Sequence, residues 1–228
     1  MSESLHFAEH RLQEIALGIM AVVYITRLFW LTRFTAGKER QAATGNGNPT
    51  SKKSIFYSWA NIGMPWAMES TRRNFFQYIQ FVIFHLGVVA AIGLSFVIPY
   101  APQLMTPAVV TVAQVLCGAA FLVGVIRIIR RIGSIYMRAL SSPDDHFSLW
   151  LLTVWFAFAF LAAPNNYAAG ETVLMLYFYM TAFFLIYVPF SKISHYLYYP
   201  FTRYYLGRTL GRRGVYPITK PSQHQIQS

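Results

Sequence analysis

Five long apolar stretches, separated by polar segments, dominate the chain. They run over residues 12–31, 76–100, 107–129, 147–163 and 172–191. Most of them approach the roughly 20 residues that a helix needs to cross a bilayer, although the fourth is short by that measure. Charged residues are nearly absent from the middle of the last four stretches. The pattern predicts an all-α integral membrane protein, a bundle of five transmembrane helices.

The composition supports this class and excludes several others. Hydrophobic residues make up 55% of the chain and aromatic residues 17%, whereas only 12% are charged. Soluble proteins carry about 25% charged residues, so this chain has too little charge to cover a water-facing surface. Its one cysteine, Cys117, lies inside an apolar stretch. A disulfide framework, a cysteine-rich zinc site and a cysteine-ligated iron–sulfur cluster are therefore excluded.

The formal net charge of +11 is informative mainly through its placement. The second and fourth connecting loops contain no Lys or Arg, whereas the other connections are basic; Arg11 is the one exception. The basic residues include Lys38, Arg40, Lys52, Lys53, Arg72 and Arg73 in the first loop, Arg130, Arg131 and Arg138 in the third, and Arg203, Arg208, Arg212, Arg213 and Lys220 in the tail. Cytoplasmic loops collect positive charge, which predicts an outside N-terminus, a cytoplasmic C-terminus and a multi-pass protein of the cell inner membrane. Because topology explains these charges, no nucleic-acid partner is expected.

We expect residues 1–205 to form one membrane domain and residues 206–228 a basic cytoplasmic tail. Residues 36–75 form a cytoplasmic loop in this division. Its first part, residues 36–54, is a polar linker rich in Gly and Asn, and residues 55–66 are aromatic. An aromatic segment of this kind suits either the membrane interface or a docking surface for a soluble partner.

The fourth helix has a clear start signal. Ser142 is a candidate N-cap, Pro143 suits the first turn, and Asp144 and Asp145 place negative charge at the positive end of the helix dipole.

Two of the six histidines are candidates for cofactor chemistry. His85 lies deep within the second apolar stretch, where an ionisable residue is a functional hypothesis by default. The simpler alternative is a neutral imidazole that is hydrogen-bonded to a neighbouring helix. His195 follows the fifth stretch at its cytoplasmic end, and its simpler role is that of an interfacial residue.

The expected topology brings these two histidines to the same half of the membrane. At about 1.5 Å per residue, His85 lies roughly 13 Å from the cytoplasmic end of its helix, and His195 ends the antiparallel fifth helix. Two imidazoles without a third histidine or a buried carboxylate suit the two axial positions of a haem b rather than a zinc or di-iron site. Gly87 would let a macrocycle approach the backbone, and Arg72, Arg73, Arg130 and Arg131 are candidate partners of the propionates.

These residues also carry a resemblance. The segments Phe84-His85-Leu86-Gly87 and Pro189-Phe190-Ser191-Lys192-Ile193-Ser194-His195, the latter followed by Pro200, resemble helices two and five of respiratory nitrate reductase gamma subunits. The similarity extends over essentially the whole chain, and the fifth-helix motif is its more specific part. The resemblance implies five spans, an outside N-terminus, and His85 and His195 as ligands of the haem iron on the cytoplasmic side.

The chain departs from this family at two positions. The family carries a second pair of histidines for an outer haem, where this sequence has Ser95 and Tyr177. The resemblance therefore implies one bis-histidine haem b, and it leaves the family's outer quinol site in doubt. Because such subunits serve several complexes, it does not identify nitrate as the substrate.

The favoured hypothesis is a membrane anchor and haem b subunit of a hetero-oligomeric respiratory oxidoreductase. It would pass electrons between the quinone pool and a soluble iron–sulfur subunit on the cytoplasmic face, and so would be one part of an enzyme. Three alternatives stay open: a cofactor-free anchor or scaffold, a small transporter or channel, and a cytochrome b anchor of a hydrogenase or formate dehydrogenase. The scarcity of polar residues within the spans counts against transport.

Overall fold

The computed structural model describes residues 1–34, 51–67 and 69–217, and no strand occurs among them. The part of the predicted polar linker between residues 35 and 50 lies outside this description. Five of the described helices are long and apolar enough to cross a membrane, which confirms the predicted number of spans by length and composition. They are Glu3–Arg33, Phe75–Tyr100, Pro107–Gly133, Pro143–Ala162 and Thr172–Phe190.

The first of these helices starts nearer the N-terminus than the apolar pattern predicts. It comprises α1 (Glu3–His6), the π-helical turn η1 (Phe7–Arg11) and α2 (Leu12–Arg33). The Ser2 hydroxyl caps it by accepting a hydrogen bond of 3.2 Å from the Leu5 amide. The residues of the first turns are helical, but many of them are polar, so the apolar pattern places the start of this helix too late.

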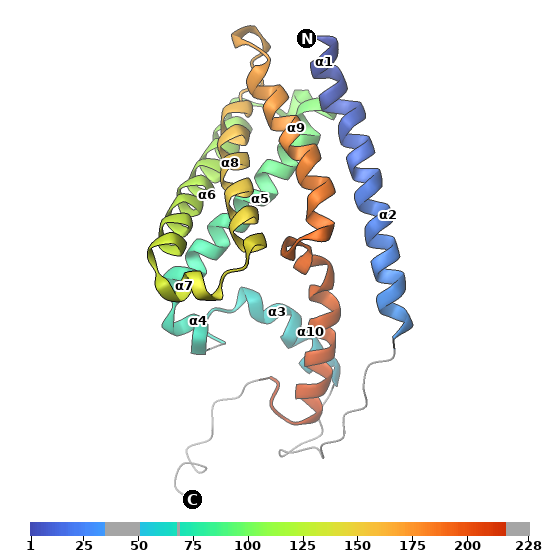
Figure 1. The fold of residues 1–228 in the computed structure, drawn as a ribbon. Coiled ribbons are helices and arrows are strands. Elements are labelled where there is room, and N and C mark those ends of the chain that lie inside the picture. The colour runs from blue at the N-terminus through green and yellow to red at the C-terminus, as the bar shows by residue number, and fades with distance from the viewer. Residues whose placement is uncertain (35–50, 68, 218–228) are drawn as a thin grey trace, which may run out of the picture. The chain divides into compact units, whose positions relative to one another are not determined.

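The other four candidate spans are α5 (Phe75–Tyr100), α6 (Pro107–Gly133), α8 (Pro143–Ala162) and α9 (Thr172–Tyr187), the last extended by the 3-10 turn η5 (Val188–Phe190). The predicted start of α8 is confirmed: Ser142 and Asp145 form a capping box, and Pro143 occupies the first turn. The shorter elements are α3 (Ser51–Ala60), η2 (Asn61–Gly63), α4 (Glu69–Arg73), η3 (Pro102–Leu104), α7 (Ile135–Leu140), η4 (Tyr167–Ala169), η6 (Lys192–Ser194) and α10 (His195–Arg212) (Figure 1).

The chain forms two compact units. The first contains Met1–Leu31 and Ile79–Ser194, and the second contains Thr32–Tyr78 and His195–Ser228. The predicted boundary between residues 205 and 206 falls inside α10. The predicted aromatic segment 55–66 corresponds to most of α3, to η2 and to the turn that follows.

Closely packed aromatic rings from α8 and α9 form part of the core of the first unit. Trp155 is fully buried and stacks on Tyr177 and Phe184, with ring centroids 6.5 Å and 4.9 Å away. Its indole N–H donates to Thr181 Oγ1 over 2.8 Å, so the polar atom of the ring is satisfied inside the bundle. Small residues allow close approach of α6 to α8, since a Cβ on Gly124 would lie 2.4 Å from Thr153 Oγ1.

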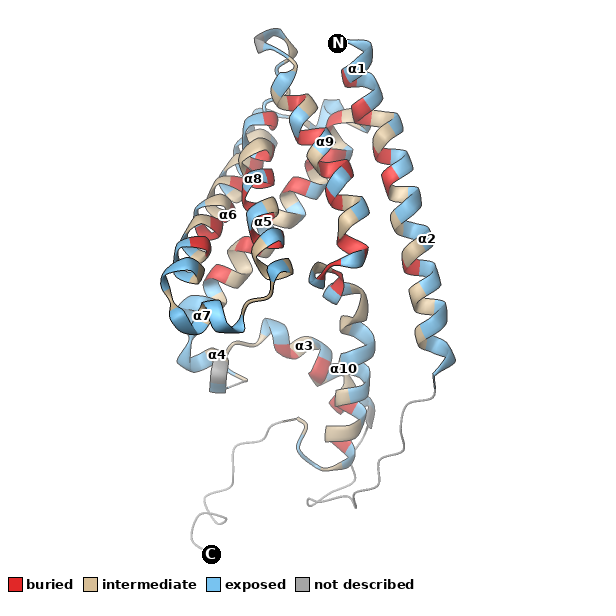
Figure 2. Cartoon of the chain, viewed as in Figure 1, coloured by how far each residue is buried: buried red, intermediate tan, exposed pale blue. Residues whose placement is uncertain are grey.

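Exposed positions run along the candidate spans (Figure 2), and many of them carry large apolar side chains. On α2 only Gln13, Ala16 and Tyr24 are buried. Its exposed residues include Ile15, Val22, Ile25, Phe29 and Trp30. Such a surface is costly in water but suits contact with lipid, which supports a multi-pass membrane protein.

The second unit is organised by the packing of α3 against α10. Two glycines of α10 lie against α3: a Cβ on Gly207 would come within 2.5 Å of Ile55 Cα, and one on Gly211 within 2.4 Å of Ser54 Cβ. The Trp59 indole donates to Pro200 O over 3.0 Å, and the Tyr199 hydroxyl donates to Trp59 O over 2.9 Å.

This packing bears on topology. Four candidate spans separate α3 from α10 in sequence. If each span crosses the membrane once, an even number of crossings returns the chain to its starting side. The contact of α3 with α10 therefore agrees with the predicted placement of the first loop and the tail on one face.

Candidate functional site

His85 lies on α5 in the first unit, where it is partly buried. Its Nδ1 lies 2.7 Å from the backbone oxygen of Phe81, one helical turn earlier. The rings of Phe81 and His85 are also in contact, with centroids 4.1 Å apart. The imidazole is thus held against its own helix by a hydrogen bond and an aromatic contact.

The hydrogen bond from His85 determines the chemistry of the other ring nitrogen. A carbonyl oxygen can only accept, so Nδ1 carries the proton. The neutral ring then has its lone pair on Nε2. Metal-bound histidines usually have this arrangement, in which the second nitrogen donates to a carbonyl or carboxylate and fixes the ring. His85 therefore has the tautomer that an axial ligand of haem iron requires.

Arg127 of α6 is a cation beside α5 that the sequence pattern did not identify as a candidate. Its guanidinium lies 5.3 Å above the ring of Phe84, the residue that precedes His85. In the sequence, the only sign of this residue is that it lies near the end of the apolar stretch 107–129. That sign is weak, because arginines near the ends of spans often extend their charged groups to the membrane surface. Within the first unit, Arg127 is a further candidate partner for an anionic group near this turn of α5.

The neighbour of Gly87 is α6. A Cβ at this position would lie 2.2 Å from Ala120 Cβ and 3.2 Å from the backbone oxygen of Leu116. Close packing of α5 on α6 is therefore sufficient reason for a glycine here. The predicted role of Gly87 beside a macrocycle stays a prediction.

His195 is the first residue of α10 and belongs to the second unit, where it is exposed. The motif that precedes it forms two 3-10 turns, η5 and η6, instead of continuing α9. Serines stabilise these turns: Ser191 Oγ donates to Val188 O over 3.1 Å, and Ser194 Oγ donates to Ser191 O over 2.8 Å. Pro189 lies within η5.

The four arginines predicted near the cofactor belong to both units. Arg72 and Arg73 are exposed on α4 in the second unit, where Arg73 forms an ion pair of 2.5 Å with Glu69. Arg130 and Arg131 end α6 in the first unit. Arg131 donates to the backbone oxygen of Asp145 over 2.5 Å, which connects α6 to the start of α8.

The two positions where the family resemblance implies missing histidines are buried and hydrogen-bonded. Tyr177 is fully buried, and its hydroxyl donates to Ala91 O over 2.5 Å. Ser95 is 7% exposed and donates to Ile92 O over 2.7 Å. Side chains of the first unit therefore fill the space around Tyr177.

A polar cluster lies at the start of the first helix. The rings of His6 and His10 are 4.6 Å apart, so they share a helix face, and the Tyr100 ring lies 5.2 Å from His10. On the buried side, Glu9 is 1% exposed and its Oε1 has no hydrogen-bond partner in the described part of the chain. Among the described residues, no three His, Cys, Asp or Glu side chains are grouped to hold a metal ion.

The loop between α8 and α9 adds two groups with shifted pKa values. Burial, followed by the charge of Glu9, raises the pKa of Tyr167. Hydrogen bonds from Ser2 lower the pKa of Glu171, and the Met1 ammonium, 3.4 Å from this carboxylate, acts in the same direction.

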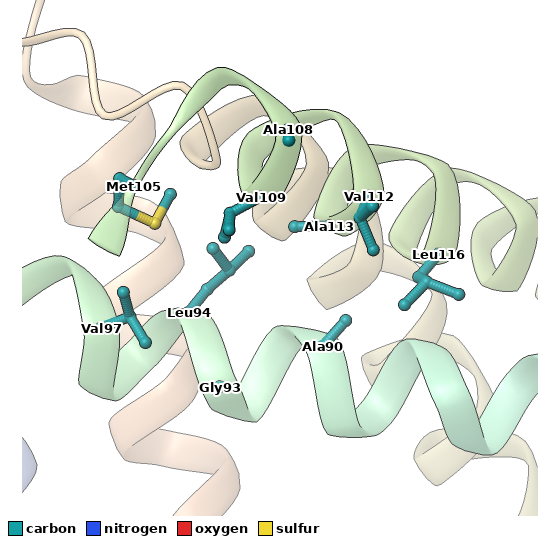
Figure 3. A pocket seen from close by; sticks show the side chains of 10 residues that line it. All are labelled: Ala90, Gly93, Leu94, Val97, Met105, Ala108, Val109, Val112, Ala113 and Leu116. Carbon is teal, nitrogen blue, oxygen red and sulfur yellow. The ribbon is translucent and has the colours of Figure 1, made fainter. Parts of the chain in front are cut away.

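An apolar groove of about 370 Å³ lies between α5 and α6 (Figure 3). Polar side chains are needed to orient a polar substrate, and the groove lining has none. It suits hydrocarbon, such as a lipid chain. The lining residues are Ala90, Gly93, Leu94, Val97, Met105, Ala108, Val109, Val112, Ala113 and Leu116.

Comparisons with models of protein families, with curated proteins and with solved structures found no match for this chain.

Proposed function

We propose that this chain is the membrane subunit of a respiratory oxidoreductase complex, and that His85 and His195 hold one haem b. In this proposal it passes electrons between quinone and a soluble iron–sulfur subunit. The observation that carries the proposal is the hydrogen bond of 2.7 Å between His85 Nδ1 and Phe81 O. It gives a histidine within a candidate membrane span the tautomer of a metal ligand.

The chain contributes position and environment to this function. When bound, a haem b supplies one-electron transfer. Phe81 O and the Phe81 ring keep His85 in one orientation, while the surrounding apolar side chains limit the access of water. Arg127, near the same turn, is available to offset the charge of a propionate.

The packing around Tyr177 supports a single haem. A second haem with axial ligands at positions 95 and 177 would need space where Tyr177, Trp155 and Phe178 are each fully buried. Neither a serine hydroxyl nor this hydrogen-bonded phenol replaces an imidazole ligand. The proposal is therefore one haem b per chain.

The proposed orientation has an outside N-terminus and a cytoplasmic C-terminus in the cell inner membrane. The segregation of basic loops and the packing of α3 with α10 support it. The exposed aromatic residues Phe56 and Trp66, 69% and 66% exposed, make the second unit a candidate docking surface for the soluble partner.

The test is the reduced-minus-oxidised absorption spectrum of the purified, detergent-solubilised protein, with haem quantified per chain. We expect one low-spin haem b in the wild type and its loss in His85→Ala and in His195→Ala. The matched controls His10→Ala and His146→Ala should keep it. A folded but colourless wild type would favour the cofactor-free scaffold, and two haems per chain would contradict the single-haem proposal.

A further inference from the structure

The start of α8 holds the segment that leads to His195. The Lys192 amide donates to Asp144 Oδ2 over 3.0 Å. The Lys192 ammonium lies 2.7 Å from Asp145 Oδ2 and donates to Ser142 Oγ over 2.8 Å. We call Ser142, Asp144, Asp145 and Lys192 the α8 clasp. All four residues belong to the first unit.

Each carboxylate of the α8 clasp is itself held in place. Asp145 Oδ2 accepts hydrogen bonds of 2.8 Å from both the amide and the hydroxyl of Ser142, as part of the capping box. Asp144 Oδ1 accepts a hydrogen bond from the Tyr187 hydroxyl, which lies 2.9 Å from Ser148 Oγ. Residues of α8 and of the end of α9 therefore orient both carboxylates independently of Lys192.

The clasp acts where the backbone cannot rely on helical hydrogen bonds. Between Tyr187 and His195 the chain forms two short 3-10 turns, which have poorer hydrogen-bond geometry than an α-helix. Lys192 lies in the second turn, three residues before His195. Hydrogen bonds to charged groups are stronger than those between neutral groups. The contacts of Lys192 can therefore fix the conformation of residues 188–194 more firmly than the hydrogen bonds of the two 3-10 turns do.

We infer that the α8 clasp is a positioning device for His195: Asp144 and Asp145 hold Lys192 and thereby set the backbone from which the imidazole projects. This inference rests on the proposed function, because the purpose assigned to the device is the orientation of an axial ligand. Axial imidazole orientation and the local charge both tune a haem. Asp144, Asp145 and Lys192 touch no cofactor in this scheme and act through His195.

The experiment compares Asp144→Ala and Lys192→Met with the wild type, with Lys192→Arg as the conservative variant. Arg138→Met is the matched control, since it removes an exposed cation whose guanidinium donates to Ile132 O over 3.1 Å. The readouts are the haem midpoint potential, the low-field electron paramagnetic resonance signal of the ferric haem, and hydrogen exchange at residues 191–198. Exchange needs no cofactor and so reports on the clasp by itself.

We expect the first two variants to keep one haem per chain but to shift its potential and its resonance signal. Exchange at residues 191–198 should accelerate about tenfold, as the loss of one hydrogen bond to a charged group predicts. Lys192→Arg and Arg138→Met should resemble the wild type. Unchanged haem signals in folded Asp144→Ala and Lys192→Met would overturn the inference, and so would unchanged exchange. A colourless wild type would instead reject the proposed function and with it the role of the clasp in ligand orientation.

Discussion

Tyr177 and Ala91 connect α9 to α5 through a hydrogen bond of 2.5 Å from the phenol to the backbone oxygen. The tyrosine is fully buried, so the hydroxyl has no access to water as an alternative partner. Its own backbone oxygen accepts a hydrogen bond of 2.7 Å from Thr181 Oγ1, which also accepts from the Trp155 indole. Through its hydroxyl and its backbone oxygen, Tyr177 is therefore part of a chain of hydrogen bonds that connects α5, α8 and α9.

Replacing Tyr177 by Phe should lower the free energy of unfolding by about 1 kcal/mol, because a buried hydrogen bond is lost without a change in ring packing. Thermal unfolding in detergent measures the effect. Tyr179→Phe is the control, since Tyr179 lies on the same helix but is 46% exposed. Equal unfolding temperatures for the two variants would contradict the role given to the hydroxyl.

Gly87→Ala should destabilise the first unit by about 1–3 kcal/mol, as overpacking in a closely packed interior does. The added methyl group would lie 2.2 Å from Ala120 Cβ, so α5 and α6 would have to separate. Gly93→Ala provides the control on the same helix, because a Cβ there meets nothing within 4 Å. We expect this second variant to be neutral or stabilising, through the better helix propensity of alanine. If both variants unfold at the same temperature, the close packing of α5 on α6 is not the reason for a glycine at position 87.

Much of this fold could be predicted from the sequence. The five spans and the start of α8 follow from apolar length and from the Ser-Pro-Asp-Asp signal. The helical residues before position 12 were missed because their polar side chains conceal the helix in an apolar pattern, although Ser2 caps it. The packing of α3 on α10 was missed as well, since it depends on contacts between distant segments.

The candidate site was predicted only in part. His85 was found because a histidine inside an apolar stretch is conspicuous, but its tautomer depends on the distance from Nδ1 to Phe81 O. Asp144 and Asp145 were interpreted only as the start of a helix. Their contacts with Lys192 join positions 47 and 48 residues apart, and no local pattern in the sequence predicts which cation they meet.

Gly207→Ala should weaken the packing of α10 on α3 in the second unit. The new Cβ would come within 2.5 Å of Ile55 Cα, a backbone atom that cannot turn aside, so we expect a loss of about 1–3 kcal/mol. Hydrogen exchange of residues 51–60 should accelerate accordingly. Gly63→Ala is the matched control in the same unit, where a Cβ meets nothing within 4 Å. Unaltered exchange in Gly207→Ala would argue against this contact.

Glu171 should make the stability of the first unit dependent on acid. Hydrogen bonds from Ser2 lower its pKa in the folded chain below the ordinary value of 4.5. Because the pKa of Glu171 is lower in the folded than in the unfolded chain, the ionised carboxylate stabilises the fold fully at pH values above the unfolded pKa. This stabilisation is lost as the pH falls through the folded pKa. Unfolding temperatures measured between neutral and acidic pH should therefore decline less steeply at low pH in Glu171→Gln than in the wild type. Glu3→Gln is the control, and parallel curves for Glu171→Gln and the wild type would contradict the prediction.

The pairing of α3 with α10 sets a condition on biosynthesis. Ser54 and Ile55 are synthesised before Gly207 and Gly211, and four candidate spans lie between them in the sequence. At ordinary translation rates the interval is on the order of ten seconds, during which residues 79–194 must enter the membrane. The face of α3 that carries Ser54 and Ile55 is therefore made before its partner helix, and a chain truncated before α10 would leave that face exposed to chaperones and proteases.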